Sequence, residues 1–167
     1  MMSSIADRRR LPRLAALAGT MTAVALGVAA CAPQPAVQCD FTPLMANRAA
    51  SPPMLGPLVP GTMQPVPLNA VSVIDETIIR KVLVQSVRAG RTPTGNMSVE
   101  TRLVNCTDYP LQVDGRTLFL TADGGDAEAA SMWQRVALPP RSFGSYAESS
   151  VAGARAESFL IEVKEAR

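Results

Sequence analysis

The chain has 167 residues, with 16 lysines and arginines against 14 aspartates and glutamates. Four of the arginines lie in the first 13 residues, and residues 31–167 carry a net charge of −1, so the chain lacks the basic face with which nucleic-acid-binding proteins neutralise phosphates. It contains no histidine, which removes the commonest general base and the commonest metal ligand.

Residues 1–30 have the pattern of an export signal. Three arginines, Arg8 to Arg10, precede an uncharged run of 17 residues over 14–30. A basic segment followed by an apolar segment of this length is typical of a secretory signal peptide. A membrane-spanning anchor is the alternative, but 17 residues is the short end of what crosses a bilayer, and this run is rich in alanine and glycine. We therefore expect a signal peptide over residues 1–30.

The end of this run, Val28 to Cys31, resembles the lipobox of bacterial lipoprotein precursors. In those precursors the cysteine is lipidated and becomes the new N-terminus after cleavage, so the resemblance predicts a lipid on Cys31 and a membrane surface as one partner. An ordinary signal peptide cut near Ala30 is the alternative. Residue 32 is alanine rather than aspartate, which by the same resemblance favours the outer membrane.

Residues 31–68 are expected to form a proline-rich tether, because residues 32–68 hold nine of the fourteen prolines. Proline fixes φ and lacks a backbone donor, so the stretch should be extended rather than helical or sheet-forming. It is either a spacer that lifts a domain off the membrane or a disordered leader whose length has no function. Apolar residues such as Met54 and Leu58 suggest that part of it lies against the domain.

From Asn69 onward the hydrophobic pattern has a period of two, which is typical of half-buried strands. The apolar phase slips near Asp114 and Gly115, where we expect a bulge or a tight turn. Trp133 is the largest apolar side chain and is expected at the core centre. The predicted fold is all-β, a small antiparallel sandwich over residues 69–167. Its strands are predicted at 78–88, 97–103, 110–121, 132–138, 142–149 and 158–164.

If Cys31 is lipidated, Cys39 and Cys106 are the two cysteines that remain. An even number of thiols in an oxidising periplasm favours a disulfide between them. Unpaired or intermolecular thiols are the first alternative. A redox-active or metal-binding pair is the second, although the chain has neither a C-x-x-C motif nor a histidine.

Other motifs do not predict catalysis or metal binding. Residues 123–126 contain two aspartates and two glycines, but the alternating ligands of a calcium loop are missing and a hairpin turn is favoured. The serines between 142 and 150 have no neighbouring base, and Asp75 with Glu76 is typical of solvated turn charges. We expect no cofactor, no metal and no enzymatic activity.

Five features follow one another in the second half of the chain: Val99–Val113, Thr121–Gly125, Trp133, Leu138–Ser142 and Glu157–Glu165. Their order resembles the YcfL-type periplasmic lipoproteins, an uncharacterised bacterial family. The resemblance implies an immunoglobulin-like sandwich and a lipoprotein location, and it implies no catalytic residues.

These observations favour a lipoprotein anchored to the outer membrane that faces the periplasm and binds another envelope protein without enzymatic activity. A small-ligand or peptidoglycan-binding module is the alternative. An exposed edge strand and an apolar patch would favour the first function, because sandwiches often bind partners by strand addition. A deep pocket with convergent polar groups would favour the second, and a buried titratable pair with shifted pKa values would favour an enzyme.

Overall fold

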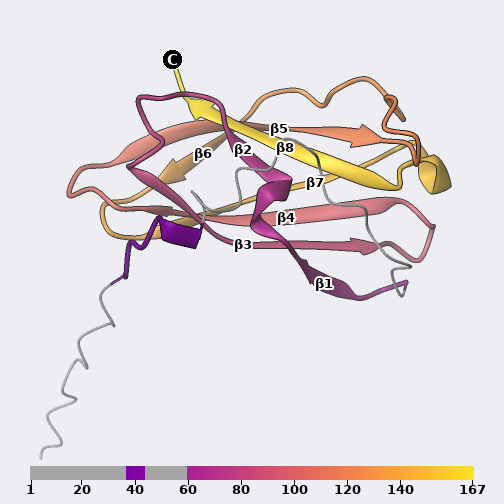
Figure 1. Cartoon of the computed structure of the whole chain (residues 1–167), viewed down its shortest axis with the longest axis horizontal. Helices are drawn as coiled ribbons and strands as arrows, with labels where there is room; N and C mark the ends of the chain where they lie inside the picture. The colour runs from indigo at the N-terminus through magenta and orange to yellow at the C-terminus, as the bar shows by residue number, and fades with distance from the viewer. Residues whose placement is uncertain (1–36, 44–59) are drawn as a thin grey trace, which may run out of the picture. The chain divides into compact units, whose positions relative to one another are not determined.

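We describe residues 37–43 and 60–167 of a computed structural model of the chain. The predicted signal peptide, Cys31 and residues 44–59 of the predicted tether lie outside the described residues. Residues 60–167 form eight strands and two short 3-10 helices (Figure 1). The strands are β1 (Met63–Val66), β2 (Val71–Val73), β3 (Val82–Arg91), β4 (Met97–Asn105), β5 (Leu111–Leu120), β6 (Gln134–Leu138), β7 (Phe143–Ser149) and β8 (Ser158–Glu165). The 3-10 helices are η1 (Leu68–Ala70) and η2 (Gly153–Arg155).

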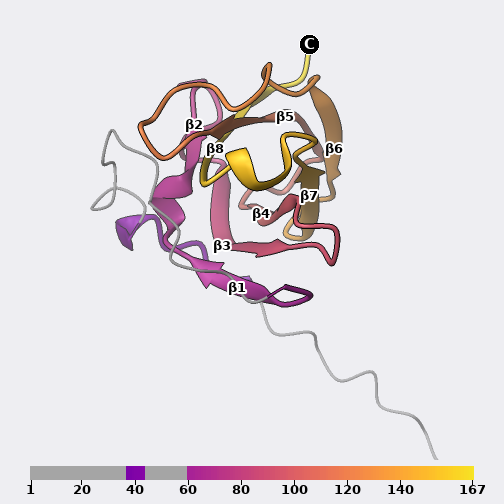
Figure 2. The same ribbon diagram turned by 90° about the vertical axis from the view of Figure 1, so that its right-hand side faces the viewer.

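The strands form two four-stranded sheets, with the orders β1-β3-β4-β7 and β2-β8-β5-β6. Figure 2 shows them as two layers, with β1, β3 and β4 on one side and β2, β8 and β5 on the other. The predicted all-β sandwich is confirmed. All strand pairs are antiparallel except β2 and β8, which run parallel. The immunoglobulin-like arrangement stays a prediction.

The period of two in the sequence places the core. In β5 the residues at odd positions from Leu111 to Phe119 are buried, and in β8 Phe159, Ile161 and Val163 are buried. Because successive side chains point to opposite faces of a sheet, these residues meet the inner face of the other sheet. Tyr146 of β7 is 1% exposed and is among the largest side chains in this core.

The expectation of a bulge or a tight turn at residues 114–115, within β5, was wrong. The strand is continuous, and Gly115 lies on the inner face with the ring of Tyr146 against it. The missing side chain makes room for that ring. Leu118 and Leu120, which created the apparent slip of phase, lie half-buried on the outer face. The irregular register lies instead in β3, between Val84 and Ser86.

The sandwich also begins earlier than the predicted boundary at Asn69. β1 pairs with β3, and Pro60 forms an isolated bridge with Arg91. The proline content of this stretch therefore did not exclude a strand. Pro65 lies in β1, an edge strand, where a proline is tolerated because one side of the strand needs no donor.

A disulfide joins Cys39 to Cys106, the pairing that the cysteine count favours. Their Cα atoms lie 5.9 Å apart. Cys106 directly follows β4, so the bond holds the segment Val37–Pro43 at that end of the sandwich (Figure 1, indigo).

Candidate interaction surface

Trp133 lies on the outer face of the β2-β8-β5-β6 sheet, and the expectation that it fills the core centre was wrong. Gly115 of β5, which faces the core, pairs with Gln134 of β6. Trp133 precedes Gln134 by one residue and therefore points the other way. It is half-buried, whereas Tyr146 and Phe119 occupy the core at 1% exposure.

Two cations hold the indole ring of Trp133. The Cζ atom of Arg116 lies 4.5 Å from the ring centroid, and the Nζ atom of Lys164 lies 4.1 Å from it. Both side chains come from the outer face, Arg116 from β5 and Lys164 from β8. A cation over an indole is attracted by the negative face of the ring. The arrangement orients Trp133 on the surface without burying it.

Ion pairs between neighbouring strands fix the charged groups around the ring. The Nε atom of Arg116 lies 2.7 Å from a carboxylate oxygen of Glu162, its partner in the β5–β8 register. The Nε atom of Arg135 lies 3.0 Å from Asp114, its partner in the β5–β6 register. Partly exposed pairs of this kind add little stability. Here they restrict the directions in which the cations point.

Beyond Arg116 the same face becomes apolar. Leu118 of β5 lies directly opposite Leu160 of β8, and both are half-buried. We use the name Trp133 surface for six residues of this face, which form an apolar part and a charged margin. The apolar part consists of Trp133, Leu118 and Leu160, and the charged margin of Arg116, Glu162 and Lys164.

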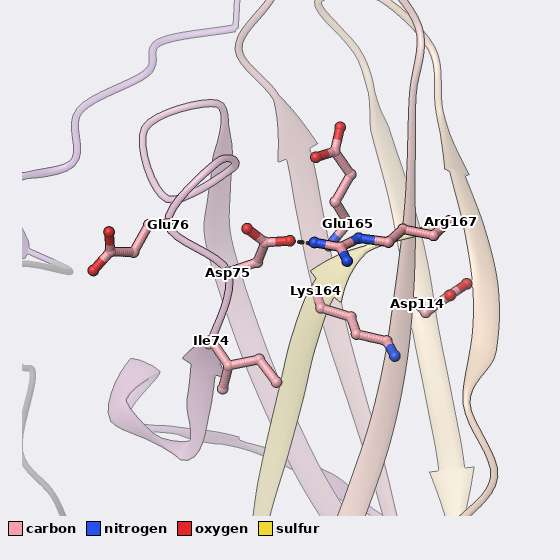
Figure 3. Close-up of a pocket in the computed structure, with 7 residues that line it drawn as sticks. All are labelled: Ile74, Asp75, Glu76, Asp114, Lys164, Glu165 and Arg167. Carbon is pink, nitrogen blue, oxygen red and sulfur yellow. Dashed lines mark hydrogen bonds between the residues drawn. The ribbon is translucent and has the colours of Figure 1, made fainter.

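An open cleft of about 580 Å³ lies where β2 and β8 end, next to the Trp133 surface (Figure 3). Lys164 belongs to both. Figure 3 shows Asp75 and Arg167 facing one another, with Glu76 pointing away. The cleft is lined by Ile74, Asp75, Glu76, Asp114, Lys164, Glu165 and Arg167.

The acidic groups of the cleft organise the chain around it. The Thr77 hydroxyl donates to Asp75 at 2.7 Å and the Thr77 N–H donates to the same oxygen at 2.9 Å. The backbone N–H of Glu165 donates to the other Asp75 oxygen at 3.3 Å. The Thr77 hydroxyl, followed by the Thr77 N–H, holds the pKa of Asp75 below its ordinary value, with smaller contributions from the Glu165 N–H and Arg167. Asp75 therefore ties the loop after β2 to β8 as a carboxylate.

Three other aspartates are also held in the charged form, and in Asp40 it is the hydrogen bond from Thr42 that lowers the pKa. The Arg141 guanidinium lowers the pKa of Asp108, and the Thr121 hydroxyl lowers the pKa of Asp123. A general acid needs a shift in the opposite direction. Residues 121–125 form a turn in which Gly124 has a φ of +83°. Within residues 37–43 and 60–167, no three side chains of the metal-ligating types are grouped to hold a metal ion.

The edges of the sheets are poorly suited to strand addition, the binding mode that the sequence suggested for a partner. β1 has four residues and contains Pro65, and β2 has three residues. At the other edges β6 and β7 pack together, so that a Cβ atom on Gly144 would lie 2.8 Å from Leu138. The outer face, rather than an edge, is therefore the better surface for a partner.

In the described part of the chain, no helix has the length and apolar character needed to cross a membrane.

Comparisons with protein-family models and with curated proteins find no match. Among solved structures, the crystal structure of cj0090 from Campylobacter jejuni is similar over 59% of this chain and 99% of that one, with 17% identity and a TM-score of 0.49. A DUF1425 family member from Shewanella sp. pv-4 is similar over 49% of this chain and 80% of that one, with 14% identity and a TM-score of 0.42. Similarities at this level assign no function.

Proposed function

We propose that this chain is a lipid-anchored envelope protein of the YcfL type whose sandwich binds another envelope protein through the Trp133 surface. The observation that carries the proposal is the position of Trp133, which is held by two cations on an outer face instead of being packed in the core. The protein acts by binding and not by catalysis.

The anchor is supported by the sequence of the N-terminus. The basic residues, the uncharged run over 14–30 and the small residues before Cys31 together favour lipidation of that cysteine. A lipid holds a protein at a membrane surface without a spanning helix. Ala32 favours the outer membrane, with the sandwich in the periplasm.

The binding surface is supported by its composition. Binding sites on proteins combine an apolar centre with a polar margin, and tryptophan and arginine are enriched among the residues that contribute most to binding. Trp133 and the Leu118–Leu160 pair supply the apolar centre. Arg116, already oriented by Glu162, supplies a donor group at its margin.

The cleft favours the second candidate, a small ligand or a peptidoglycan fragment, because Lys164 and Arg167 converge there with carboxylates. It is open rather than enclosed, and its Asp75 and Glu165 already bond to Thr77. A sugar that stacked on Trp133 would have to compete with the cations of Arg116 and Lys164, which already lie over the ring. We therefore rank this function second.

The test is photocrosslinking in intact cells with a photoreactive amino acid at position 160. Ser145, on the outer face of the other sheet, is the control position. We expect a protein adduct from position 160 that is absent from position 145. The adduct should disappear when Trp133→Ala is added and persist when Phe143→Ala is added.

Phe143 is a matched control because it is also an aromatic residue on an outer face, 49% exposed, with the Arg102 guanidinium 3.4 Å from its ring centroid. Equal adducts from both positions, or an adduct that is insensitive to Trp133→Ala, would contradict the proposed surface. Binding of muropeptides to the wild-type protein, with loss of that binding in Arg167→Ala, would instead favour the second candidate.

A further inference from the structure

We infer that the end of the sandwich that carries Cys106 rests on the headgroups of the membrane that anchors the chain, with Tyr109 and Lys81 as the contact residues. This inference depends on the lipid anchor of the proposed function but not on its protein partner.

The first argument is the length of chain between the lipid and the first fixed point of the domain. Cys39 is bonded to Cys106, and seven residues separate Cys31 from Cys39. At a maximum of about 3.6 Å per residue, the sandwich cannot move more than about 25–30 Å from the lipid. Without the bond, the first strand would be β1 at Met63, and the same calculation allows roughly 110 Å.

The second argument is that three connections meet at this end. The N–H of Cys106 donates to the carbonyl of Lys81 at 2.8 Å, which joins the β4–β5 connection to the start of β3. The N–H of Arg141, in the β6–β7 connection, donates to the carbonyl of Thr107 at 3.0 Å. The short segment between Cys31 and Cys39 therefore brings all three connections toward the membrane together.

The third argument is the chemistry of the exposed side chains. Tyr109 is 48% exposed, and the Nζ atom of Lys81 lies 6.0 Å from the centroid of its ring. Tyrosine has an apolar ring and a polar hydroxyl and is enriched at the boundary between lipid and water. Lysine can lay its apolar stem along a surface while its ammonium group reaches phosphates.

The charges favour this orientation only moderately. Arg80 is exposed beside Lys81, and Arg141 is paired with Asp108 at 2.8 Å. The carboxylates of the cleft belong to the β2-β8 side of the same end, and anionic headgroups would repel them. The domain should therefore lean on the side that carries Tyr109 and Lys81, with the lipid supplying most of the affinity.

The chain contains only two lysines, Lys81 and Lys164, which makes amine labelling a site-specific test. The mature protein is reconstituted at low density in phosphatidylethanolamine–phosphatidylglycerol vesicles and treated with an amine-reactive reagent, and peptide mass spectrometry measures the rate at each lysine. The reference is the Cys31→Ser variant in solution. We expect labelling of Lys81 to slow by about fivefold or more in vesicles, as for a side chain in the headgroup layer. Labelling of Lys164 should change by less than about twofold.

A longer segment between Cys31 and Cys39 should abolish the protection of Lys81 from labelling. Inserting about ten glycine and serine residues between Pro35 and Ala36 keeps the disulfide and adds roughly 30 Å of reach, so Lys81 should label as fast as in solution. The double variant Cys39→Ser/Cys106→Ser should behave in the same way wherever it still folds. Protection of Lys81 that survives the insertion would overturn the inference.

Other outcomes separate the two proposals. A mature protein whose mass shows no lipid would overturn the anchor, and the inference with it. A lipidated protein whose Lys81 labels as fast as in the Cys31→Ser variant would overturn the inference and leave the anchor intact. Protection that rises with protein density would assign this end to a second copy of the chain instead of the lipid, which also overturns it.

Discussion

The ring of Tyr146 lies directly against Gly115, so that a Cβ atom at position 115 would be 2.8 Å from its Cδ2 atom. The contact joins β7 of one sheet to β5 of the other. The Tyr146 hydroxyl continues the contact with a hydrogen bond of 3.0 Å to Thr117, two residues further along β5. Burial raises the pKa of this phenol, and the bonds to Ser131 and Thr117 oppose that rise.

Gly115→Ala should destabilise the fold by about 1–3 kcal/mol, the usual cost of overpacking a core. The added methyl group must displace the ring of Tyr146, which has no exposed side toward which to move. Denaturation in urea measures the change. Gly125→Ala is the control, because its Cβ atom would meet only the Thr121 side chain, at 3.3 Å. Equal stability of the two variants would contradict the packing described here.

Asn105→Ala should cost about 3 kcal/mol or more, because each buried group left without its hydrogen bond costs about 1–3 kcal/mol. The side-chain amide donates to the carbonyls of Tyr109 and Leu138, at 2.8 and 3.0 Å. Its oxygen accepts the N–H and the hydroxyl of Thr107, at 2.8 and 2.7 Å. Thermal unfolding gives the loss. Asn96→Ala, which removes no side-chain hydrogen bond between described residues, should be nearly neutral.

Trp133→Ala should cost about 1–2 kcal/mol, since each of the two cation–π contacts of this half-buried ring contributes about 0.5–1 kcal/mol. The truncation of a tryptophan in a core costs about 3–5 kcal/mol. The same variant removes the only indole, so its stability is followed by circular dichroism. A loss in the core range would show that Trp133 holds the fold together and weaken its assignment to a binding surface.

Loss of the disulfide should destabilise the oxidised protein by about 4 kcal/mol, the chain-entropy value for a loop with a sequence separation of 67. Cys39→Ser, Cys106→Ser and the double variant should all lose the same amount, because either change removes the whole bond. Unfolding measured with and without reductant checks this. Losses that add in the double variant would mean that each side chain contributes through contacts of its own.

Acid should weaken the link that Asp75 makes between β8 and the loop that follows β2. The pKa of Asp75 in the folded chain lies below the ordinary value of 3.8, so its contribution is fully present above that value and is lost as the pH falls through the folded-state pKa. Wild-type and Asp75→Asn proteins should therefore differ in melting temperature at neutral pH and converge once the pH has fallen below the folded-state pKa of Asp75. A difference that stays constant over this range would exclude the carboxylate as its source.

The sequence was sufficient to predict strands whose two faces differ in polarity. Alternation in β4 and β8 predicted both strands and their buried faces, because most of their outward residues are polar or charged, such as Glu100 and Arg102 in β4 and Glu162 and Lys164 in β8. β5 failed this test at Leu118 and Leu120, which are apolar but face outward. Hydrophobicity alone cannot separate a core leucine from a leucine on an outer face.

The candidate surface could not be predicted for the same reason. Trp133 has the size of a core residue, and its position on the outer face depends on the two cations over its ring, Arg116 and Lys164. Those residues are 17 and 31 positions away in the sequence. A pairing of this kind is set by which strands become neighbours, and local patterns carry no information about it. By contrast, the cysteine count needed no register to favour the pairing of Cys39 with Cys106.

The parallel pairing of β2 with β8 sets the order in which the sandwich can be completed. β8 is the last strand of the chain, and it lies between β2 and β5 in the sheet. Until it has been synthesised, β2 has no partner, β5 can pair only with β6, and the second sheet has no centre. Contacts between residues so distant in sequence make folding slow. The second sheet of a chain that emerges from its N-terminus therefore stays incomplete until the final residues arrive.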